Sequence, residues 1–288
     1  MWGFLPLTKF PFLVYTDTII PAFGRKTESF MFTVAHFLWL AVSVLLIVGF
    51  AAFLLKRRPE VKSVLNVSCA LCILSELTKT FCAFQFVPSA SGAEIYPFIE
   101  TQQLPLHLCS ILIFLIFYAR FTKNEAGRDV ILGFLYPAGT VGAAFALALP
   151  TIFSKSITVE KAFTDPWAYQ YFLYHVMLIV LGIYIAFAGR VDLRPRHYFT
   201  SIGLLSLFAF GSLYVNSTLA VPTYKDGDLL SVEYTTNFLF TYRPPIDIPL
   251  TEKWHWILYL LVLVSLALSL IAVCYLPIFL RHRRKKTA

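Results

Sequence analysis

Residues 255–280 read HWILYLLVLVSLALSLIAVCYLPIFL and contain no Asp, Glu, Lys or Arg. A helix that crosses the hydrocarbon core of a bilayer needs about 20 consecutive, mostly apolar residues. The apolar residues of this run are continuous rather than alternating with polar ones, which excludes a strand of a membrane barrel. The stretch therefore predicts a membrane-spanning helix, and it sets the expectation for the whole chain, an all-α polytopic membrane protein.

Further apolar runs precede this one along the chain. They cover residues 31–55, 62–87, 103–119, 130–153, 167–189 and 197–220. We therefore predict seven transmembrane helices in a domain at 31–280, with an interfacial N-terminal segment at 1–30 and a basic cytoplasmic tail at 281–288. The N-terminal segment is rich in aromatic residues and is broken by prolines, which is typical of a segment at the membrane surface rather than of a secretory signal.

The composition of the 288 residues supports the same class. Apolar residues make up 58% and charged residues 14%, and the mean hydropathy is +0.71. Soluble domains are usually about 45–50% apolar and about 25% charged. This composition excludes a soluble enzyme, a disordered tail and a collagen-like fibre. Five cysteines are also too few for a disulfide scaffold.

Lysine and arginine are distributed unevenly between the two sets of loops, and this distribution predicts the orientation. Fifteen lie on the side of the C-terminal tail, eight lie on the other side, and Lys79 lies within a span. The fifteen are Lys56, Arg57, Arg58, Lys62, Arg120, Lys123, Arg128, Arg190, Arg194, Arg196, Arg281, Arg283, Arg284, Lys285 and Lys286. Because positive loops stay in the cytoplasm, we expect the C-terminus inside, the N-terminus outside and the cell membrane as the location. The net charge of +8 is then a basic belt facing anionic lipid, so we expect membrane lipids as partners and no nucleic acid.

Polar side chains inside the spans are the functional candidates, because burying ionisable groups in hydrocarbon costs several kcal/mol unless they are paired or reach water. Counting about 1.5 Å of rise per residue from the span ends brings several of them to similar depth in the outer half. They are Glu76, Lys79, His107, Cys109, His175 and Asn216. The inner half holds no comparable set in the sequence. We therefore predict a polar cavity open to the outside or to the outer leaflet.

Each candidate also has a structural interpretation. Glu76 and Lys79 stand three residues apart on one helix face and can neutralise one another. Asn216 can join two helices by hydrogen bonds. His36 and His255 can each simply hydrogen-bond a neighbouring helix.

The cysteines carry similar alternatives. Cys69 and Cys72 form a CxxC pattern, but in an apolar helix we interpret them as packing residues. Cys82 lies toward the outer end of the second span, where it could bridge to Cys109 in an oxidising compartment. Such a disulfide would remove the Cys109 thiol from any chemistry.

Cys109 and His175 have the clearest chemical potential. A thiol has a pKa of about 8.5, and a nearby imidazole can take its proton and make it a nucleophile. His107 lies only two residues before Cys109, so on a regular helix the two would face different sides. Pro105 loosens the backbone at this point, which relaxes that objection. Otherwise His175 is the better base and His107 a second wall of the cavity.

Short motifs along the chain resemble one membrane protein family. These are Phe30 with His36, LPLHLCSI at 104–111, Tyr174-His175, and Asn237-Phe238 followed by Tyr242-Arg243-Pro244. Together they resemble the YwaF-type integral membrane proteins, which are relatives of animal transmembrane protein 164. The resemblance covers most of the chain, and the seven spans agree with it.

The resemblance implies an acyltransferase that moves a fatty acyl chain between phospholipid and lysophospholipid. Cys109 would carry the acyl group as a thioester and His175 would be the base, with His107 beside them. We place the remaining candidates in substrate binding; they are Glu76, Lys79, Asn216, Asn237 and His36. No glycine-rich phosphate loop, metal-spaced histidine pair or dinucleotide motif is evident, so we expect neither a metal nor a soluble cofactor.

Other classes remain open at this point. A transporter or channel would use Glu76, Lys79 and the histidines to bind an ion or a small polar solute. The sequence contains no inverted repeat, although Pro137 and Pro150 interrupt the fourth span. A seven-helix receptor is a third interpretation, but the last span has no lysine for a retinal Schiff base.

Overall fold

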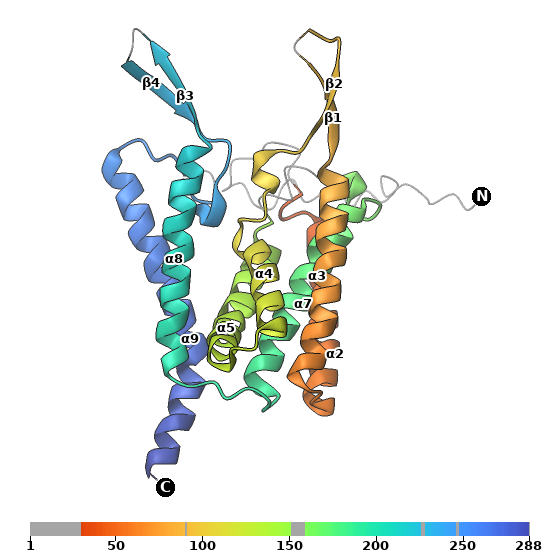
Figure 1. The fold of residues 1–288 in the computed structure, drawn as a ribbon, viewed down its shortest axis with the longest axis vertical. Helices are drawn as coiled ribbons and strands as arrows, with labels where there is room; N and C mark the ends of the chain where they lie inside the picture. Colours follow the sequence, from red (N-terminus) through yellow and green to blue (C-terminus); the bar gives the residue numbers. More distant parts are fainter. Residues whose placement is uncertain (1–29, 90, 151–158, 226–227, 246–247, 288) are drawn as a thin grey trace, which may run out of the picture.

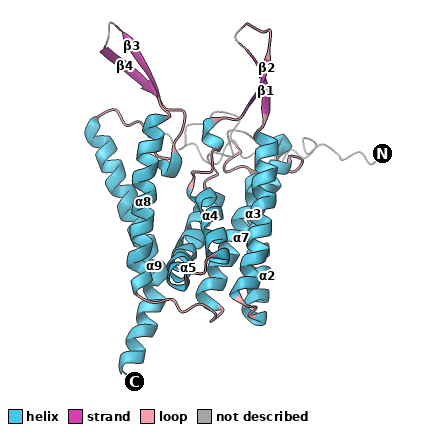
Figure 2. Ribbon diagram, in the orientation of Figure 1, coloured by secondary structure: helices cyan, strands magenta, loops and turns pink. Residues whose placement is uncertain are grey.

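The computed structural model describes residues 30–89, 91–150, 159–225, 228–245 and 248–287. Apart from Phe30, the expected interfacial segment at 1–30 lies outside the described residues. The described chain is dominated by long helices that run side by side, with two-stranded hairpins projecting from one end (Figures 1 and 2).

Long apolar helices make up the body of the molecule. They are α2 (Val34–Arg57), α3 (Val61–Ala83), α4 (Leu108–Phe121), α5 (Glu125–Pro137), α6 (Ala143–Ala148), α7 (Pro166–Phe187), α8 (Arg196–Thr218) and α9 (Lys253–Thr287). The π-helix η4 (Ala138–Gly142) joins α5 to α6 in one continuous span, and short 3-10 turns lie at η3 (Thr101–Gln103), η6 (Val159–Lys161) and η7 (Phe238–Phe240). Within the described residues, seven helical segments are long and apolar enough to cross a membrane. The prediction of a multi-pass helical membrane protein is therefore confirmed.

The hairpins mark one end of the bundle. Strands β1 (Gln85–Pro88) and β2 (Ile95–Phe98) pair in antiparallel fashion after α3, and β3 (Val221–Lys225) and β4 (Asp228–Glu233) pair after α8. We call this the hairpin end. The opposite end, which carries the loops after α2, α4 and α7 and the C-terminus, holds the basic residues counted above, and we call it the basic end (Figure 1).

Helix α7 lies at the centre of the fold. It packs against α2, α3, α5, α6 and η4, and most of its residues are buried. The closest approach occurs where Gly182 of α7 meets η4, since a Cβ on Gly182 would lie 2.6 Å from the Thr140 side chain and 2.9 Å from the Tyr136 carbonyl oxygen. By contrast, α2 and α9 present rows of exposed apolar side chains, as expected for helices that face lipid.

Several helix ends differ from the predicted spans. The fourth span runs from Glu125 to Ala148 rather than from 130 to 153, and α9 continues to Thr287, through most of the residues predicted as a tail. Two further differences lie at the hairpin end. Helix α3 ends at Ala83 rather than near residue 87, because the apolar residues that follow it form strand β1. Lys79 is therefore roughly 6 Å from the end of its helix by the usual rise, shallower than expected. Helix α4 begins only at Leu108, because Pro105 and its neighbours form a turn.

Candidate functional site

The turn before α4 places Cys109 at the start of a helix. His107 is the N-cap, with extended backbone angles of φ −69° and ψ 152°, so Cys109 is the second helical residue. The first backbone N–H groups of a helix have no partner within it. The N–H groups of Cys109 and Ser110 and the Ser110 hydroxyl lie near the Cys109 sulfur. The thiol therefore lies among donors suited to a developing negative charge.

His175 of α7 is held in the tautomer that a general base requires. Its Nδ1 lies 2.7 Å from the Tyr171 carbonyl oxygen. Because a carbonyl oxygen only accepts, Nδ1 carries the hydrogen and the Nε2 lone pair is free. Within the described residues, Nε2 is buried and has no hydrogen-bond partner. The residue is 2% exposed, so the free lone pair points into the protein interior.

Tyrosines on α7 connect His175 to the start of α4. Tyr174 donates from its hydroxyl to the Cys109 carbonyl oxygen at 2.7 Å. Tyr171 has its ring 4.5 Å from the His175 ring and donates from its hydroxyl to the Ala146 carbonyl oxygen at 2.6 Å. The residue next to His175 on α7 is therefore bonded to the backbone of the predicted nucleophile.

His107 shares one feature with His175. Its Nε2 is buried without a hydrogen-bond partner among the described residues. Phe238 covers the imidazole edge-on, with ring centroids 4.9 Å apart. His107 precedes the first helical residue of α4. The rule that residues two apart on a helix face different sides therefore does not apply to His107 and Cys109.

Lys79 brings a positive charge to this neighbourhood. Its ammonium forms an ion pair with Glu76 at 2.7 Å, as the i,i+3 spacing predicted, and its side chain is 13% exposed. The same charge acts on both His107 and Cys109. Lys79 can therefore stabilise negative charge that develops on the sulfur or on an attacked carbonyl, while Glu76 limits the net charge of the site.

Asn216 is fully occupied by a neighbouring loop. Its amide nitrogen donates to the Phe238 carbonyl oxygen and the Thr241 hydroxyl, and its oxygen accepts from Thr236 and from the Phe238 N–H. Asn237 likewise organises the same loop, through bonds to the backbone of Tyr242 and Arg243. These two asparagines thus bind protein groups, and the structural interpretation suits them better than direct contact with substrate.

His36 also has two protein partners. Its Nδ1 accepts from the Phe32 N–H at 3.1 Å, so its Nε2 carries the hydrogen and donates to the Leu147 carbonyl oxygen at 2.8 Å. The imidazole therefore joins the start of α2 to the end of α6, and it offers no free lone pair.

The cysteines are free thiols. Cys82 and Cys109 are both partly buried and unbridged, so the disulfide alternative is wrong and the Cys109 sulfur is available. Cys69 and Cys72 are buried in α3 among apolar residues, which agrees with their interpretation as packing residues.

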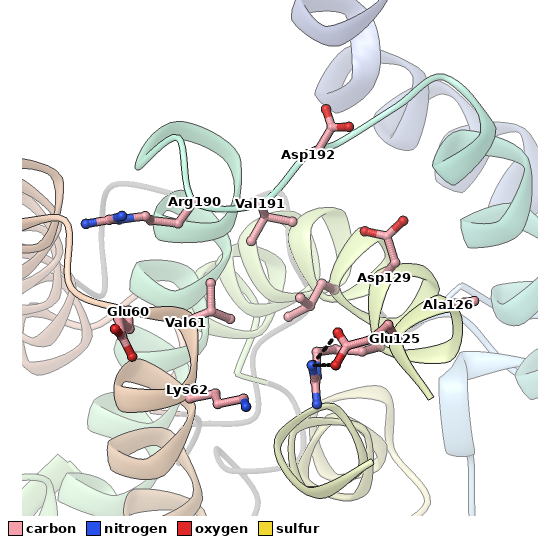
Figure 3. Close-up of a pocket in the computed structure, with 11 residues that line it drawn as sticks. Glu60, Val61, Lys62, Glu125, Ala126, Asp129, Arg190, Val191 and Asp192 are labelled. Atoms are coloured by element: carbon pink, nitrogen blue, oxygen red, sulfur yellow. Dashed lines mark hydrogen bonds and ion pairs between the residues drawn. The ribbon is translucent and has the colours of Figure 1, made fainter. Parts of the chain in front are cut away.

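The basic end holds a polar cluster that the sequence interpretation missed. A pocket of about 600 Å³ lies there, between the starts of α3 and α5 and the loop after α7 (Figure 3). Its charged groups are largely paired: Arg128 with Glu125, and Asp129 with both Arg196 and the buried His197. Arg128 also donates to the Ala119 and Thr122 carbonyl oxygens at the end of α4. The bonds of Asp129 join α5 to the start of α8, and those of Arg128 join α5 to the end of α4.

Metal-binding geometry is not a feature of either cluster. Across the parts of the chain that the structure describes, no group of three His, Cys, Asp or Glu side chains is arranged to hold a metal ion.

Comparison with known proteins identifies one family. The model of the TMEM164 family matches residues 31–275, which is most of the chain and includes every candidate residue named above. No curated protein and no solved structure matches the chain.

Proposed function

The chain belongs to the TMEM164 family, and from that premise we propose that it is a membrane acyltransferase that uses Cys109 to move a fatty acyl chain between phospholipid and lysophospholipid. The observation that supports this proposal is the free Nε2 lone pair of His175 on a helix that is bonded, through Tyr174, to the residue with the unbridged thiol. A nucleophile, a base and donors for the oxyanion are the groups that acyl transfer requires.

The first half-reaction forms the acyl-enzyme. His175 Nε2 takes the thiol proton, and the Cys109 sulfur attacks the ester carbonyl carbon of a phospholipid. The negative charge on the carbonyl oxygen is stabilised by the N–H groups at the start of α4 and by Lys79. The ester C–O bond then breaks, and the lysophospholipid leaves with the proton held by His175. The acyl group remains as a thioester on Cys109.

The second half-reaction reverses these steps with a different lipid. A lysophospholipid hydroxyl gives its proton to His175 and attacks the thioester carbon. The C–S bond breaks, the sulfur recovers the proton, and the acceptor leaves as a phospholipid. His107 also has a free Nε2. This nitrogen can accept a hydrogen bond beside the reacting atoms, and it can donate one when it is protonated.

The nucleophile test compares two cysteines of similar exposure near the hairpin end. We expect Cys109→Ser to abolish acyl transfer and hydroxylamine-sensitive acyl labelling, while Cys82→Ser retains both, because both side chains are partly buried and the substitution changes little volume. His175→Ala should lower the rate by about 10²–10⁴-fold, the usual contribution of a general base. Wild-type transfer by Cys109→Ser would overturn the proposal.

The same assay separates the enzyme from a transporter. A transporter that uses the intramembrane charges would lose its activity in Glu76→Gln and keep it in Cys109→Ser. The acyltransferase predicts the opposite order of severity, since Glu76 is 33% exposed and acts only through Lys79.

A further inference from the structure

A loop from the far end of the sequence covers the candidate site. Phe238 lies in η7, between β4 and α9, and its side chain is fully buried with its ring against His107. His107 is the residue that begins the helix carrying Cys109. Phe238 is therefore an apolar wall at the hairpin end of the site, the end where the hairpins project beyond the helices (Figure 1).

The wall is held in place by one buried side chain. Asn216 of α8 is fully buried and uses both ends of its amide on this loop, at 2.9 Å to the Phe238 N–H and 3.1 Å to the Phe238 carbonyl oxygen. It also bonds the hydroxyls of Thr236 and Thr241, at 3.0 and 2.9 Å. The backbone of Phe238 is thus fixed on both sides by the same residue.

The loop conformation is one that its sequence would not adopt alone. Leu239 and Phe240 have left-handed backbone angles, with φ of 53° and 54°. Such angles are unfavourable for non-glycine residues and persist only where surrounding bonds impose them. Tyr259 of α9 supplies a further bond, donating to the Phe240 carbonyl oxygen. Bonds from α8 and α9 therefore hold an unfavourable backbone conformation directly after Phe238. This arrangement indicates that the position of the Phe238 ring, which contacts His107, has a function.

We propose that Phe238, positioned by Asn216, keeps water away from the acyl-thioester on Cys109 and so makes a lipid hydroxyl the acyl acceptor. This inference rests on the proposed function. A thioester has two fates: a lysophospholipid hydroxyl attacks it to give phospholipid and free thiol, or water attacks it to give a free fatty acid and free thiol. Excluding water from a site is a general means of preventing such hydrolysis of a reactive intermediate.

The test measures the ratio of the two products. Purified protein in vesicles receives phospholipid with a labelled acyl chain and unlabelled lysophospholipid, and labelled free fatty acid is compared with labelled product phospholipid. We expect the ratio to rise as the side chain at position 238 becomes smaller, from Phe238→Leu through Phe238→Val to Phe238→Ala, reaching about tenfold for alanine as water enters. A structural role alone would lower both products together and leave the ratio unchanged.

Phe240→Ala is the matched control, because it removes the same side chain from the same loop while Phe238 keeps its contact with His107. Its ratio should stay at the wild-type value. Asn216→Ala should raise the ratio as Phe238→Ala does, since it releases the Phe238 backbone. If the alanine variants do not fold, Phe238→Val carries the test as the milder truncation.

The outcomes are distinguishable. A wild-type protein that forms no acyl-thioester overturns the proposed function and this inference with it. A wild-type protein that transfers acyl chains, with a ratio that stays flat from Phe238→Leu to Phe238→Ala, overturns this inference and leaves the proposed function standing.

Discussion

His36 and His175 are buried histidines on helices that pack together, and the partners of their ring nitrogens give them different roles. Both nitrogens of His36 are bonded to the backbone of Phe32 and Leu147. His175 has one bonded nitrogen and one free lone pair. An imidazole with two protein bonds holds the fold together, whereas one with a free lone pair can accept a proton.

The difference predicts the effect of His36→Ala. Removing this ring leaves the Leu147 carbonyl oxygen buried without its donor, a loss of about 1–3 kcal/mol. We expect a lower thermal unfolding temperature in detergent and an unchanged acyl-transfer rate per folded molecule. His255→Ala is the control, because that ring bonds an exposed turn at the start of α9. Loss of acyl-thioester in His36→Ala at full thermal stability would instead assign His36 to substrate.

The candidate site shows which residue-level features a sequence can predict. The i,i+3 pair of Glu76 and Lys79 followed from helix geometry. The place of Cys109 at a helix start did not follow from counting residues along the apolar run, because α4 begins only at Leu108. The partners of Asn216 did not follow, because they lie more than twenty residues away in a loop without regular structure. Nor did the free nitrogen of His175, since it depends on which atoms surround the ring.

At the scale of elements, the apolar spans were predictable and several of their ends were not. An apolar run shows that a helix can cross the membrane, but it does not show where the helix stops if the next residues are also apolar. Residues 85–88, QFVP, continue the apolar run of α3 yet pair with residues 95–98 as strands. At the start of α4, Pro105 did mark a turn, and the turn is what places Cys109 at a helix N-terminus.

The π-helix η4 and α7 meet so closely that the element contact itself can be tested. A Cβ added at Gly182 would lie 2.6 Å from the Thr140 side chain and 2.9 Å from a backbone oxygen, so Gly182→Ala must push the two elements apart. Overpacking of this kind usually costs about 1–3 kcal/mol. We expect a clear fall in the thermal unfolding temperature.

Gly203→Ala on α8 provides the comparison for Gly182→Ala, because a Cβ there meets no atom within 4 Å. Its stability should not fall and should rise by about 0.5–1 kcal/mol, because alanine favours a helix interior more than glycine does. Equal stability of the two alanine variants would show that α7 and η4 are not packed as described.

At the scale of the whole molecule, the basic residues and the candidate site lie toward opposite ends of the bundle. The basic residues gather at one end of the bundle, where the pocket between the starts of α3 and α5 and the loop after α7 also lies (Figure 3). The neighbourhood of Cys109 lies toward the other end, beside the hairpins. If positive loops stay in the cytoplasm, the site serves the outer leaflet.

We therefore predict that an epitope fused after Ala288 is accessible only from the cytoplasm, and that an epitope inserted after Gly92, at the tip of the β1–β2 hairpin, is accessible from outside intact cells. Gly92 is suited to an insertion because it lies in an exposed turn with open space around it. The two positions lie at opposite ends of the bundle, so each controls for the other: a correctly inserted protein must show one epitope on each side. The reverse result, with the tail outside and the hairpin inside, would contradict the charge rule for this chain. It would also transfer the proposed acyl exchange to lipids of the cytoplasmic leaflet, because the site is fixed to the hairpin end whichever way the molecule crosses the membrane.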